Sequence, residues 1–399
     1  MTTQEVLDLY SRCVIGNYAR LPVVIVRAEG SRMWDADGKS YLDMFPGWGC
    51  SLLGHCHPRV VEAIREQVGR LIHVDNTFYT EEQGRLAALL HQHGFGGKSF
   101  FSNSGAEANE AAIKLARRQA PEGRYKVITM ERSFHGRTYG AMSATAQSKT
   151  HQGHEPLVPG FVYVPFNDID AVAKAIDRET AAIMVEPIQG EGGVNIPDDN
   201  YLPALREMCD ENRMMLILDE VQTGCGRTGT WFGYQHYPIE PDIITLAKAL
   251  GNGAPIGAMV ARPEVADALV PGTHATTFGA NALAVSAAIA TLETIEQDNL
   301  LEQTRQMSAY IMNRAEQLKD RFGFIEEIRG RGLMLAIELS LPGKAIVSAA
   351  LAKGLRINCT QDTVLRLLPA MTITTAEVDE GFDILTAAIE ETEQQLVSS

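Results

Sequence analysis

The chain has 399 residues, 45% of them hydrophobic, which is typical of a globular protein with two closely associated domains. It carries 35 basic and 50 acidic residues, a formal net charge of -15, which argues against a polyanion-binding surface and for small ligands. The start lacks the features of a secretory signal, no run approaches the ~18 apolar residues of a membrane span, and the six cysteines form no C-x-x-C. We therefore expect a cytoplasmic protein that contacts neither nucleic acid nor membrane.

The N-terminal region predicts a small antiparallel unit. Residues 23–44, "VVIVRAEGSRMWDADGKSYLDM", alternate apolar and polar side chains around Asp37-Gly38. This dipeptide is favoured in tight hairpins, and the alternation is typical of half-buried strands.

The middle of the chain predicts an α/β fold. From about residue 80, short apolar runs such as "KVITM", "AAIMV", "MMLIL" and "DIITL" are separated by amphipathic stretches. This rhythm is typical of a mostly parallel sheet with helices on both faces. After Asn281, long helical patterns lead to a second, smaller α+β unit, which we expect the N-terminal hairpin to join. We thus predict a large domain over residues 56–295 and a small domain built from residues 1–55 and 296–399.

Polar residues follow five of the predicted strands. They are Ser104, His135, Glu186, Asp219 and Lys248. In an open α/β sheet, ligands bind at the carboxyl edge of the strands. The sequence therefore predicts that these five side chains share one crevice.

Asp219 and Lys248 stand at the ends of wholly apolar runs, "MMLILDEVQ" and "DIITLAKALGNG". A buried carboxylate needs a permanent cationic or hydrogen-bonding partner, although a helix N-cap is the plain alternative for Asp219. A solvated surface amine is the plain alternative for Lys248. Together the two residues match what pyridoxal phosphate (PLP) requires, an imine-forming amine and an acid that keeps the pyridine nitrogen protonated.

The stretch "FFSNSGAEANEAAIKLARR" supplies a candidate phosphate cradle. Ser104, Gly105 and Ala106 open a strongly periodic helix whose first amides suit a dianion, although a plain N-cap explains them equally well. In "ERSFHGRT", Phe134 can stack on a flat cofactor or belong to the core, and Arg137 can hold a carboxylate or lie on the surface.

The turn "GHCHP" predicts no metal site. His55, Cys56 and His57 are consecutive, so their side chains cannot easily face one ion. We expect no metal elsewhere in the chain.

Six motifs together resemble the class III, or ω-, aminotransferases of PLP fold type I: "SGAEANEA", "SFHGRT", "VEPIQGEGG", "LILDEVQTGCGRTG", "LAKALGNGAPIGA" and "HATTFGANALA". The resemblance runs from "GSRMWDADGKSYLD" to "VLRLLPAMTIT" and implies the aspartate aminotransferase-like fold. Within the class the chain is most similar to the acetylornithine branch. This implies transfer of the δ-amino group of N2-acetylornithine to 2-oxoglutarate in arginine biosynthesis, with ornithine, succinylornithine and 4-aminobutyrate as alternative donors.

The resemblance also implies the cofactor contacts. Lys248 matches the Schiff-base lysine, Asp219 the partner of the pyridine nitrogen and Gln222 a contact of the ring hydroxyl. Thr277 matches a threonine that reaches the phosphate of the neighbouring subunit, which implies a homodimer with shared active sites. The remaining implied cofactor contacts are Ser104, Gly105, Ala106, Phe134, Glu220 and Val221.

On the substrate side, Arg137 matches the arginine that holds the α-carboxylate of the amine donor. Glu191 and Arg366 match a pair in which Glu191 masks Arg366 until 2-oxoglutarate or glutamate binds. Thr276 and Tyr18 match further substrate contacts.

Trp48, in "MFPGWGC", departs from the family pattern, because a small residue is usual at this position of the substrate pocket. Two other functions stay open on the residues alone. One is a PLP-dependent aminomutase or racemase. The other is a protein that binds phosphate ligands without catalysis, although "FFSNSGAEANE" lacks the G-K-[ST] ending of a P-loop.

Overall fold

The computed structural model describes residues 1–397. Its N-terminal unit consists of helix α1 (Thr3–Cys13) and three antiparallel strands, β1 (Ile25–Glu29), β2 (Arg32–Asp35) and β3 (Ser40–Asp43). The turn between β2 and β3 contains Gly38 at a φ of 84°, a conformation that glycine adopts without strain. The antiparallel unit predicted around this turn is therefore present.

The large sheet has seven strands in the order β4-β10-β9-β8-β7-β5-β6. Strands β5 to β9 pair in parallel, and β10 is antiparallel to both of its neighbours. The prediction of a mostly parallel α/β sheet is confirmed. The strands are β4 (Lys98–Ser102), β5 (Lys126–Met130), β6 (Phe161–Val164), β7 (Thr180–Val185), β8 (Met215–Asp219), β9 (Ile243–Leu246) and β10 (Gly257–Ala261).

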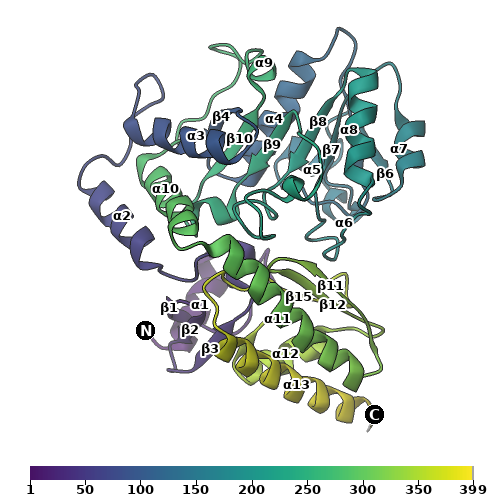
Figure 1. Ribbon diagram of the computed structural model, residues 1–399. Helices are drawn as coiled ribbons and strands as arrows, with labels where there is room; N and C mark the ends of the chain where they lie inside the picture. Colours follow the sequence, from purple (N-terminus) through teal and green to yellow (C-terminus); the bar gives the residue numbers. More distant parts are fainter. Residues whose placement is uncertain (398–399) are drawn as a thin grey trace.

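Helices cover both faces of this sheet (Figure 1). Successive residues of a strand point to opposite faces, so Ile217 packs in one core with the alanines of α4, while Leu216 and Leu218 pack in the other core with α8 and α10. The helices of this region are α2 (Pro58–Val68), α3 (Glu81–His93), α4 (Gly105–Gln119), α5 (Tyr139–Ala144), α6 (Ser148–His151), α7 (Ile169–Ala175), α8 (Tyr201–Asn212), α9 (Pro263–Ala266) and α10 (Ala282–Gln297), with short 3-10 helices η2 (Gly233–His236) and η3 (Lys248–Gly251).

The C-terminal region forms an antiparallel sheet of order β11-β12-β15-β14 with helices against it. Strand β13 leaves this unit and pairs in parallel with β3, so both ends of the chain lie in the same half of the molecule (Figure 1). The domain boundaries themselves stay a prediction. The elements are α11 (Leu300–Arg321), β11 (Ile325–Arg331), β12 (Met334–Leu339), α12 (Lys344–Ala352), β13 (Leu355–Arg356), β14 (Asn358–Thr360), β15 (Val364–Leu367) and α13 (Thr375–Val397).

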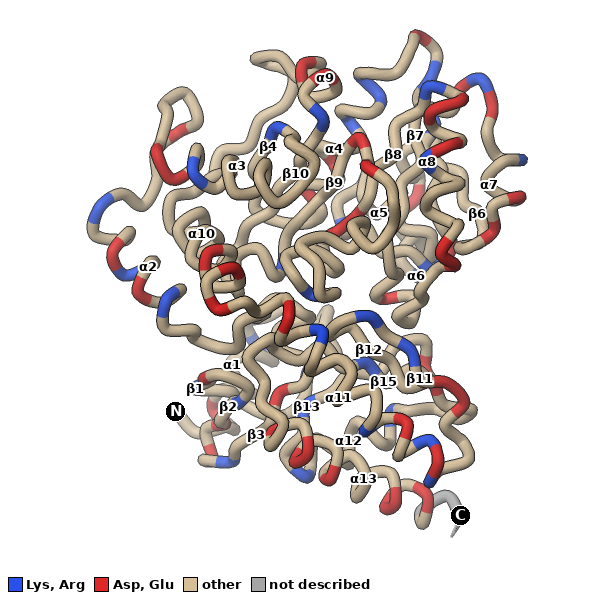
Figure 2. Tube along the Cα trace, viewed as in Figure 1, with Lys and Arg blue, Asp and Glu red and all other residues tan. Residues whose placement is uncertain are grey.

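Charged residues are spread over the helices of both halves, and acidic residues are frequent on α8 and α13 (Figure 2). None of the helices described between residues 1 and 397 combines the length and the apolar composition needed to cross a membrane. The 3-10 helix η1 (Pro46–Gly49) connects the N-terminal sheet to the large sheet, and Trp48 within it has a φ of 61°.

Candidate active site

Five strands of the large sheet end at one cavity of about 400 Å³. These strands, β4, β5, β7, β8 and β9, all run in the same direction, so their carboxyl ends meet at one edge. The structure places the five polar residues predicted to converge on the lining of this cavity: Ser104, His135, Glu186, Asp219 and Lys248. It also places there Gly105, Ala106, Phe134, Arg137, Glu191, Val221 and Gln222.

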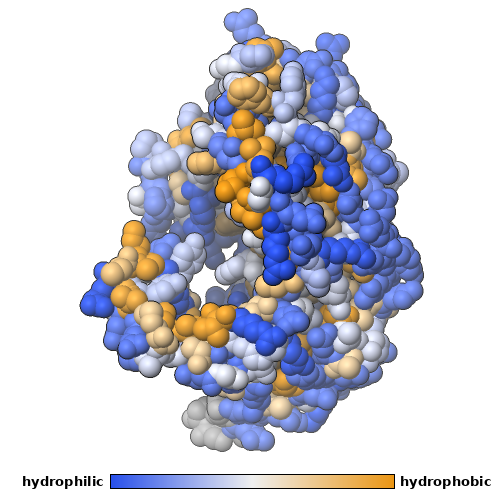
Figure 3. Space-filling model, turned by 90° about the vertical axis from the view of Figure 1, so that its left-hand side faces the viewer, coloured by the Kyte–Doolittle hydropathy of each residue, from blue (hydrophilic) through white to orange (hydrophobic). Residues whose placement is uncertain are grey.

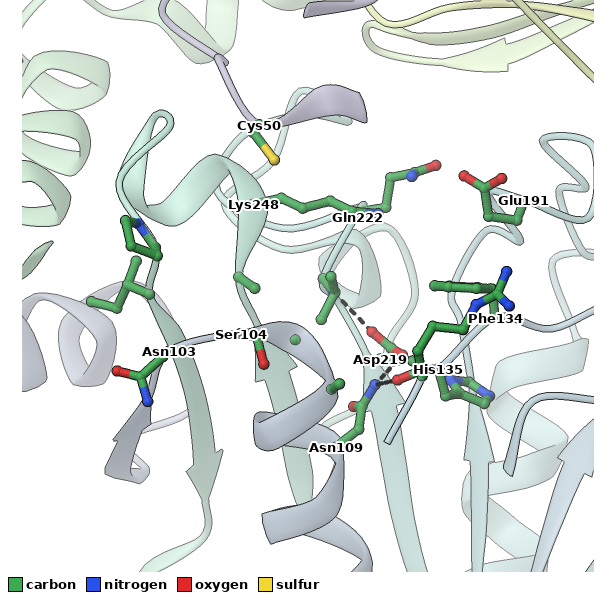
Figure 4. A pocket seen from close by; sticks show the side chains of 18 of the residues that line it. Cys50, Asn103, Ser104, Asn109, Phe134, His135, Glu191, Asp219, Gln222 and Lys248 are labelled. Carbon is green, nitrogen blue, oxygen red and sulfur yellow. Dashed lines mark hydrogen bonds and ion pairs between the residues drawn. The ribbon is translucent and has the colours of Figure 1, made fainter. Parts of the chain in front are cut away.

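Asp219 is a buried carboxylate that accepts three hydrogen bonds. Its Oδ2 atom accepts hydrogen bonds from Asn109 Nδ2 at 2.8 Å and from His135 Nδ1 at 2.7 Å, and its Oδ1 atom accepts one from the Val221 amide at 3.0 Å (Figure 4). Thr245 in turn holds Asn109 through a 2.6 Å bond. No helix begins at Asp219, so the N-cap alternative is wrong. These bonds offset the cost of burying the charge and fix its orientation.

Helix α4 points its first turn at the cavity. Ser104 caps the helix by accepting a bond from the Glu107 amide at 3.2 Å, so the plain N-cap role is present. The backbone beside it also comes very close to the β8 loop, since a Cβ atom on Gly105 would lie 2.9 Å from both methyl groups of Val221. Free amides at the positive end of the helix dipole face the cavity and suit a phosphate.

Lys248 begins η3, directly beyond β9. Its φ of 43° is rare for a residue with a side chain, and such conformations cluster at functional sites. The side chain is half-buried and extends across the cavity toward Gln222 (Figure 4). The Oε1 atom of Gln222 is buried and has no hydrogen-bond partner among the described residues. The solvated surface amine is therefore the wrong interpretation of Lys248.

Glu191 and Arg366 form a bidentate ion pair. The Arg366 side chain is fully buried, and its Nη1 and Nη2 atoms lie 2.9 Å and 3.1 Å from the two carboxylate oxygens of Glu191. Burial acts to raise the pKa of Glu191, but the Arg366 guanidinium outweighs it and the pKa is lowered. Asn358 Oδ1 accepts two further bonds from Arg366, and the Gly190 carbonyl accepts one at 3.1 Å. Glu191, which lines the cavity, thus separates the Arg366 guanidinium from it.

Glu186 is a second buried carboxylate on the lining. Its two oxygens accept bonds from the amides of Phe134 and Gly190, both at 3.2 Å. The pKa of Glu186 is raised to about 7, chiefly by burial; His135 opposes the shift, and the charge of Asp219 contributes to it. This carboxyl group is therefore poised to change its charge near neutral pH.

Some predicted site residues lie outside this cavity. Glu220 turns away from it and accepts bonds from the Gly233 and Tyr234 amides at 2.8 Å and 2.7 Å, because successive residues of an extended segment point to opposite sides. Thr276 accepts a bond from Asn103 at 3.1 Å, and Thr277 is exposed beside it. Tyr18 and Trp48 line a separate cavity.

Sequence reasoning missed several lining residues, among them Asn109 and Cys50. Asn109, which holds Asp219, lies four residues after Gly105 and so on the same face of α4. A polar residue on that otherwise apolar face was the available signal. Cys50 comes from the N-terminal segment, and no local pattern pointed to it. Burial raises the pKa of the Cys50 thiol, which the charges of Lys248 and Arg227 oppose.

These residues fit PLP. The cavity offers a buried carboxylate for a ring nitrogen, helix amides for a phosphate, an unpartnered acceptor on Gln222 for a ring hydroxyl and a lysine that reaches across it. Over residues 1–397, no group of three or more His, Cys, Asp or Glu side chains is arranged to hold a metal ion.

Residues 15–389 match the model of the family described as aminotransferase class-III. The chain is 49% identical to the acetylornithine aminotransferase of Caldanaerobacter subterraneus subsp. tengcongensis, over 95% of this chain and 97% of that protein. It is 48% identical to that of Methanocaldococcus jannaschii, over 95% and 96%. A structure of Toxoplasma gondii ornithine aminotransferase with partial occupancy of PLP superposes with a TM-score of 0.92, at 34% identity, over 99% and 96% of the chains. The chain therefore belongs to the class III aminotransferases, which are PLP-dependent enzymes.

Proposed function

We propose that this enzyme transfers the δ-amino group of N2-acetylornithine to 2-oxoglutarate, giving N-acetylglutamate 5-semialdehyde and glutamate, as a step of arginine biosynthesis in the cytoplasm. The observation that carries this proposal is the presence of two arginines with different access. Arg137 lines the cavity with its guanidinium 5.4 Å from the Phe134 ring, whereas Arg366 is covered by Glu191. N2-acetylornithine has one carboxylate and 2-oxoglutarate has two, so a site that binds them in turn needs one arginine that is always accessible and a second that is accessible only to the second substrate.

Each residue near the cofactor then has a defined task. Asp219 would hold the ring nitrogen protonated, Gln222 would accept from the ring hydroxyl, and the amides that open α4 would bind the phosphate. When bound, PLP supplies an electron-withdrawing ring that stabilises negative charge on the substrate carbon. Lys248 would carry the imine-forming amine, and its free Nζ would be the base that takes the proton from that carbon.

The Glu191–Arg366 pair would distinguish between the substrates of the two half-reactions. While the donor is bound, Glu191 neutralises Arg366, so a donor tail without a second carboxylate does not meet an uncompensated charge. When 2-oxoglutarate enters, one of its two carboxylates replaces Glu191 on Arg366 as a bidentate partner. This exchange lets one cavity accept both substrates in turn.

We also propose a homodimer with shared active sites. Large apolar side chains between α2 and α3 and near residue 278 are exposed, among them Ile72 at 54%, Phe78 at 63% and Phe278 at 60%. Figure 3, which looks at the side of the molecule where α2 lies, shows hydrophobic residues gathered around a hollow on this face. Exposed apolar patches of this kind mark interaction surfaces. Thr277, which lies in this region, would then reach the neighbouring cavity.

A half-reaction tests the proposed activity. The purified enzyme with bound cofactor is mixed with N2-acetylornithine in the absence of any oxo acid, and the visible absorbance of the cofactor is followed. We expect faster bleaching by N2-acetylornithine than by ornithine or 4-aminobutyrate. Faster bleaching by either of these amines would reassign the donor, and a protein that stays colourless with added PLP would contradict the proposal as a whole.

A further inference from the structure

A second, larger cavity of about 1000 Å³ lies between the N-terminal segment and the C-terminal unit. We name it the outer cavity. It shares no lining residue with the site described above. Its walls come from α1, from residues 18–25, from η1 and from residues 356–362, and its lining includes Tyr18, Trp48, Lys149, Arg356 and Asn358.

The outer cavity adjoins the Glu191–Arg366 pair. Its lining residue Asn358 accepts bonds from Arg366 Nε at 2.9 Å and from Nη2 at 2.6 Å. Two more lining residues, Thr360 and Gln361, donate to the Glu191 carbonyl at 2.8 Å and 2.9 Å. Both members of the pair are thus held by the wall of the outer cavity.

Arg356 supplies a guanidinium without an acid partner in this wall. It lies 5.5 Å from the centroid of the Phe45 ring, and Arg366 lies 5.0 Å from the same ring. Burial lowers the pKa of Arg356, Asp43 opposes this, and Arg366 adds to it. Among the described residues no carboxylate lies within 4.0 Å of Arg356, and its one hydrogen bond runs to the carbonyl of Ile357. A partly desolvated cation with so few partners is costly unless an anion joins it.

The remaining lining favours an anion with an apolar stem. Three further cationic side chains, Arg20, Lys149 and Lys344, face one acidic side chain, Asp362. Trp48 packs edge-on against the Phe45 ring, with centroids 5.6 Å apart, and is 52% exposed. The indole therefore forms part of the outer wall and offers an apolar surface next to Arg356.

We propose that Arg356 is a specificity-determining residue that binds a carboxylate at the far end of the donor's N2-acyl group. The outer cavity would then accept, beside N2-acetylornithine, acylated ornithines whose acyl group ends in a carboxylate. This inference rests on the proposed function, since it extends the donor site of the same reaction.

The test compares N2-succinylornithine with N2-acetylornithine, which differ in the terminal carboxylate. We measure kcat/KM for both donors with the wild-type holoenzyme, Arg356→Leu and Arg356→Lys. A charge-assisted bond is expected to change the succinyl-to-acetyl ratio of kcat/KM by about tenfold to a hundredfold, so the ratio falls by that factor in Arg356→Leu. Arg356→Lys keeps a positive charge at this position, so its succinyl-to-acetyl ratio should lie between those of wild type and Arg356→Leu. Lys344→Ala removes an exposed cation from the same cavity and is expected to change the ratio less than about twofold.

The opposite results would overturn the inference. A ratio that is the same in wild type and Arg356→Leu excludes the carboxylate contact, and equal losses for both donors assign Arg356 a structural role. Calorimetric binding of N2-succinylnorvaline and N2-acetylnorvaline, which lack the reacting amine, separates this inference from the proposed function. If neither acylated ornithine bleaches the cofactor, the proposed function fails. The inference then stands only if Arg356→Leu still weakens binding of the succinylated analogue at least about tenfold relative to the acetylated one.

Discussion

The two walls of the active-site cavity are built differently. The wall at the sheet edge carries Asp219 at the end of β8, Asn109 on α4 and His135 in the loop after β5, all buried and bonded to one another. The opposite wall carries the Glu191–Arg366 pair, whose two members are 175 residues apart in the chain. In the proposed reaction the first wall would hold a cofactor that stays in place, whereas the second would meet substrates that alternate. An ion pair that exchanges Glu191 for a substrate carboxylate would suit this second task.

The largest expected effect comes from the sheet-edge wall. Lys248→Ala removes both the imine-forming amine and the base, so we expect turnover to fall more than about a thousandfold. The measurement is steady-state transamination together with the visible absorbance of the reconstituted enzyme. Lys174→Ala, at an exposed position of α7, is a control for loss of a lysine charge. Near-native turnover of Lys248→Ala would remove Lys248 from its role.

Changes in the wall that carries the Glu191–Arg366 pair, here called the substrate wall, should affect the two half-reactions differently. Glu191→Ala uncovers Arg366, so we expect the KM for 2-oxoglutarate to fall. We also expect kcat/KM for N2-acetylornithine to fall by about tenfold, because this donor then meets an uncompensated guanidinium. Glu191→Gln keeps the shape and a hydrogen bond without the charge, and its effects should be intermediate. The two half-reactions are measured separately by cofactor absorbance. Equal losses of kcat/KM in both half-reactions would contradict the proposal that the two walls have different roles.

Local patterns in the sequence predicted the sheet-edge wall well. Apolar runs mark buried strands, and the polar residue that ends each run must lie at the carboxyl edge, so Asp219 and Lys248 were found without tertiary information. The same logic could not tell that Glu220 points away from the cavity, because this depends on how the chain turns after β8. Asn109 required knowing which face of α4 meets the sheet.

The substrate wall depended on the family resemblance instead. No local pattern links Glu191 to Arg366, since the pair forms only when β15 packs near the loop after β7. Tyr18 and Trp48 were expected in the substrate pocket, and the structure places them in the outer cavity beside it. Arg356 was not singled out at all, because an arginine in a two-residue strand gives no sign of its surroundings.

The smallest expected effect concerns Glu186, which lies between the two walls. Its pKa is about 7 in the folded protein, against an ordinary value of 4.5, chiefly because it is buried. Between these pH values the folded state binds the proton more tightly than the unfolded state. The contribution of this group to stability is therefore present at low pH and is lost as the pH rises through about 7.

Urea unfolding of the holoenzyme at pH 5 and pH 8 measures this contribution. The free energy of unfolding of wild type relative to Glu186→Gln should fall between these two pH values, because the glutamine never acquires a charge beside Asp219. Glu326→Gln, at an exposed position of β11, serves as the control, and its difference from wild type should not change with pH. If the difference in free energy of unfolding between wild type and Glu186→Gln is also the same at pH 5 and pH 8, Glu186 is ionised over this whole range and carries a permanent charge. If the difference falls as expected, the site has a neutral carboxyl group at its centre below neutral pH, and this group does not repel the carboxylate of Asp219.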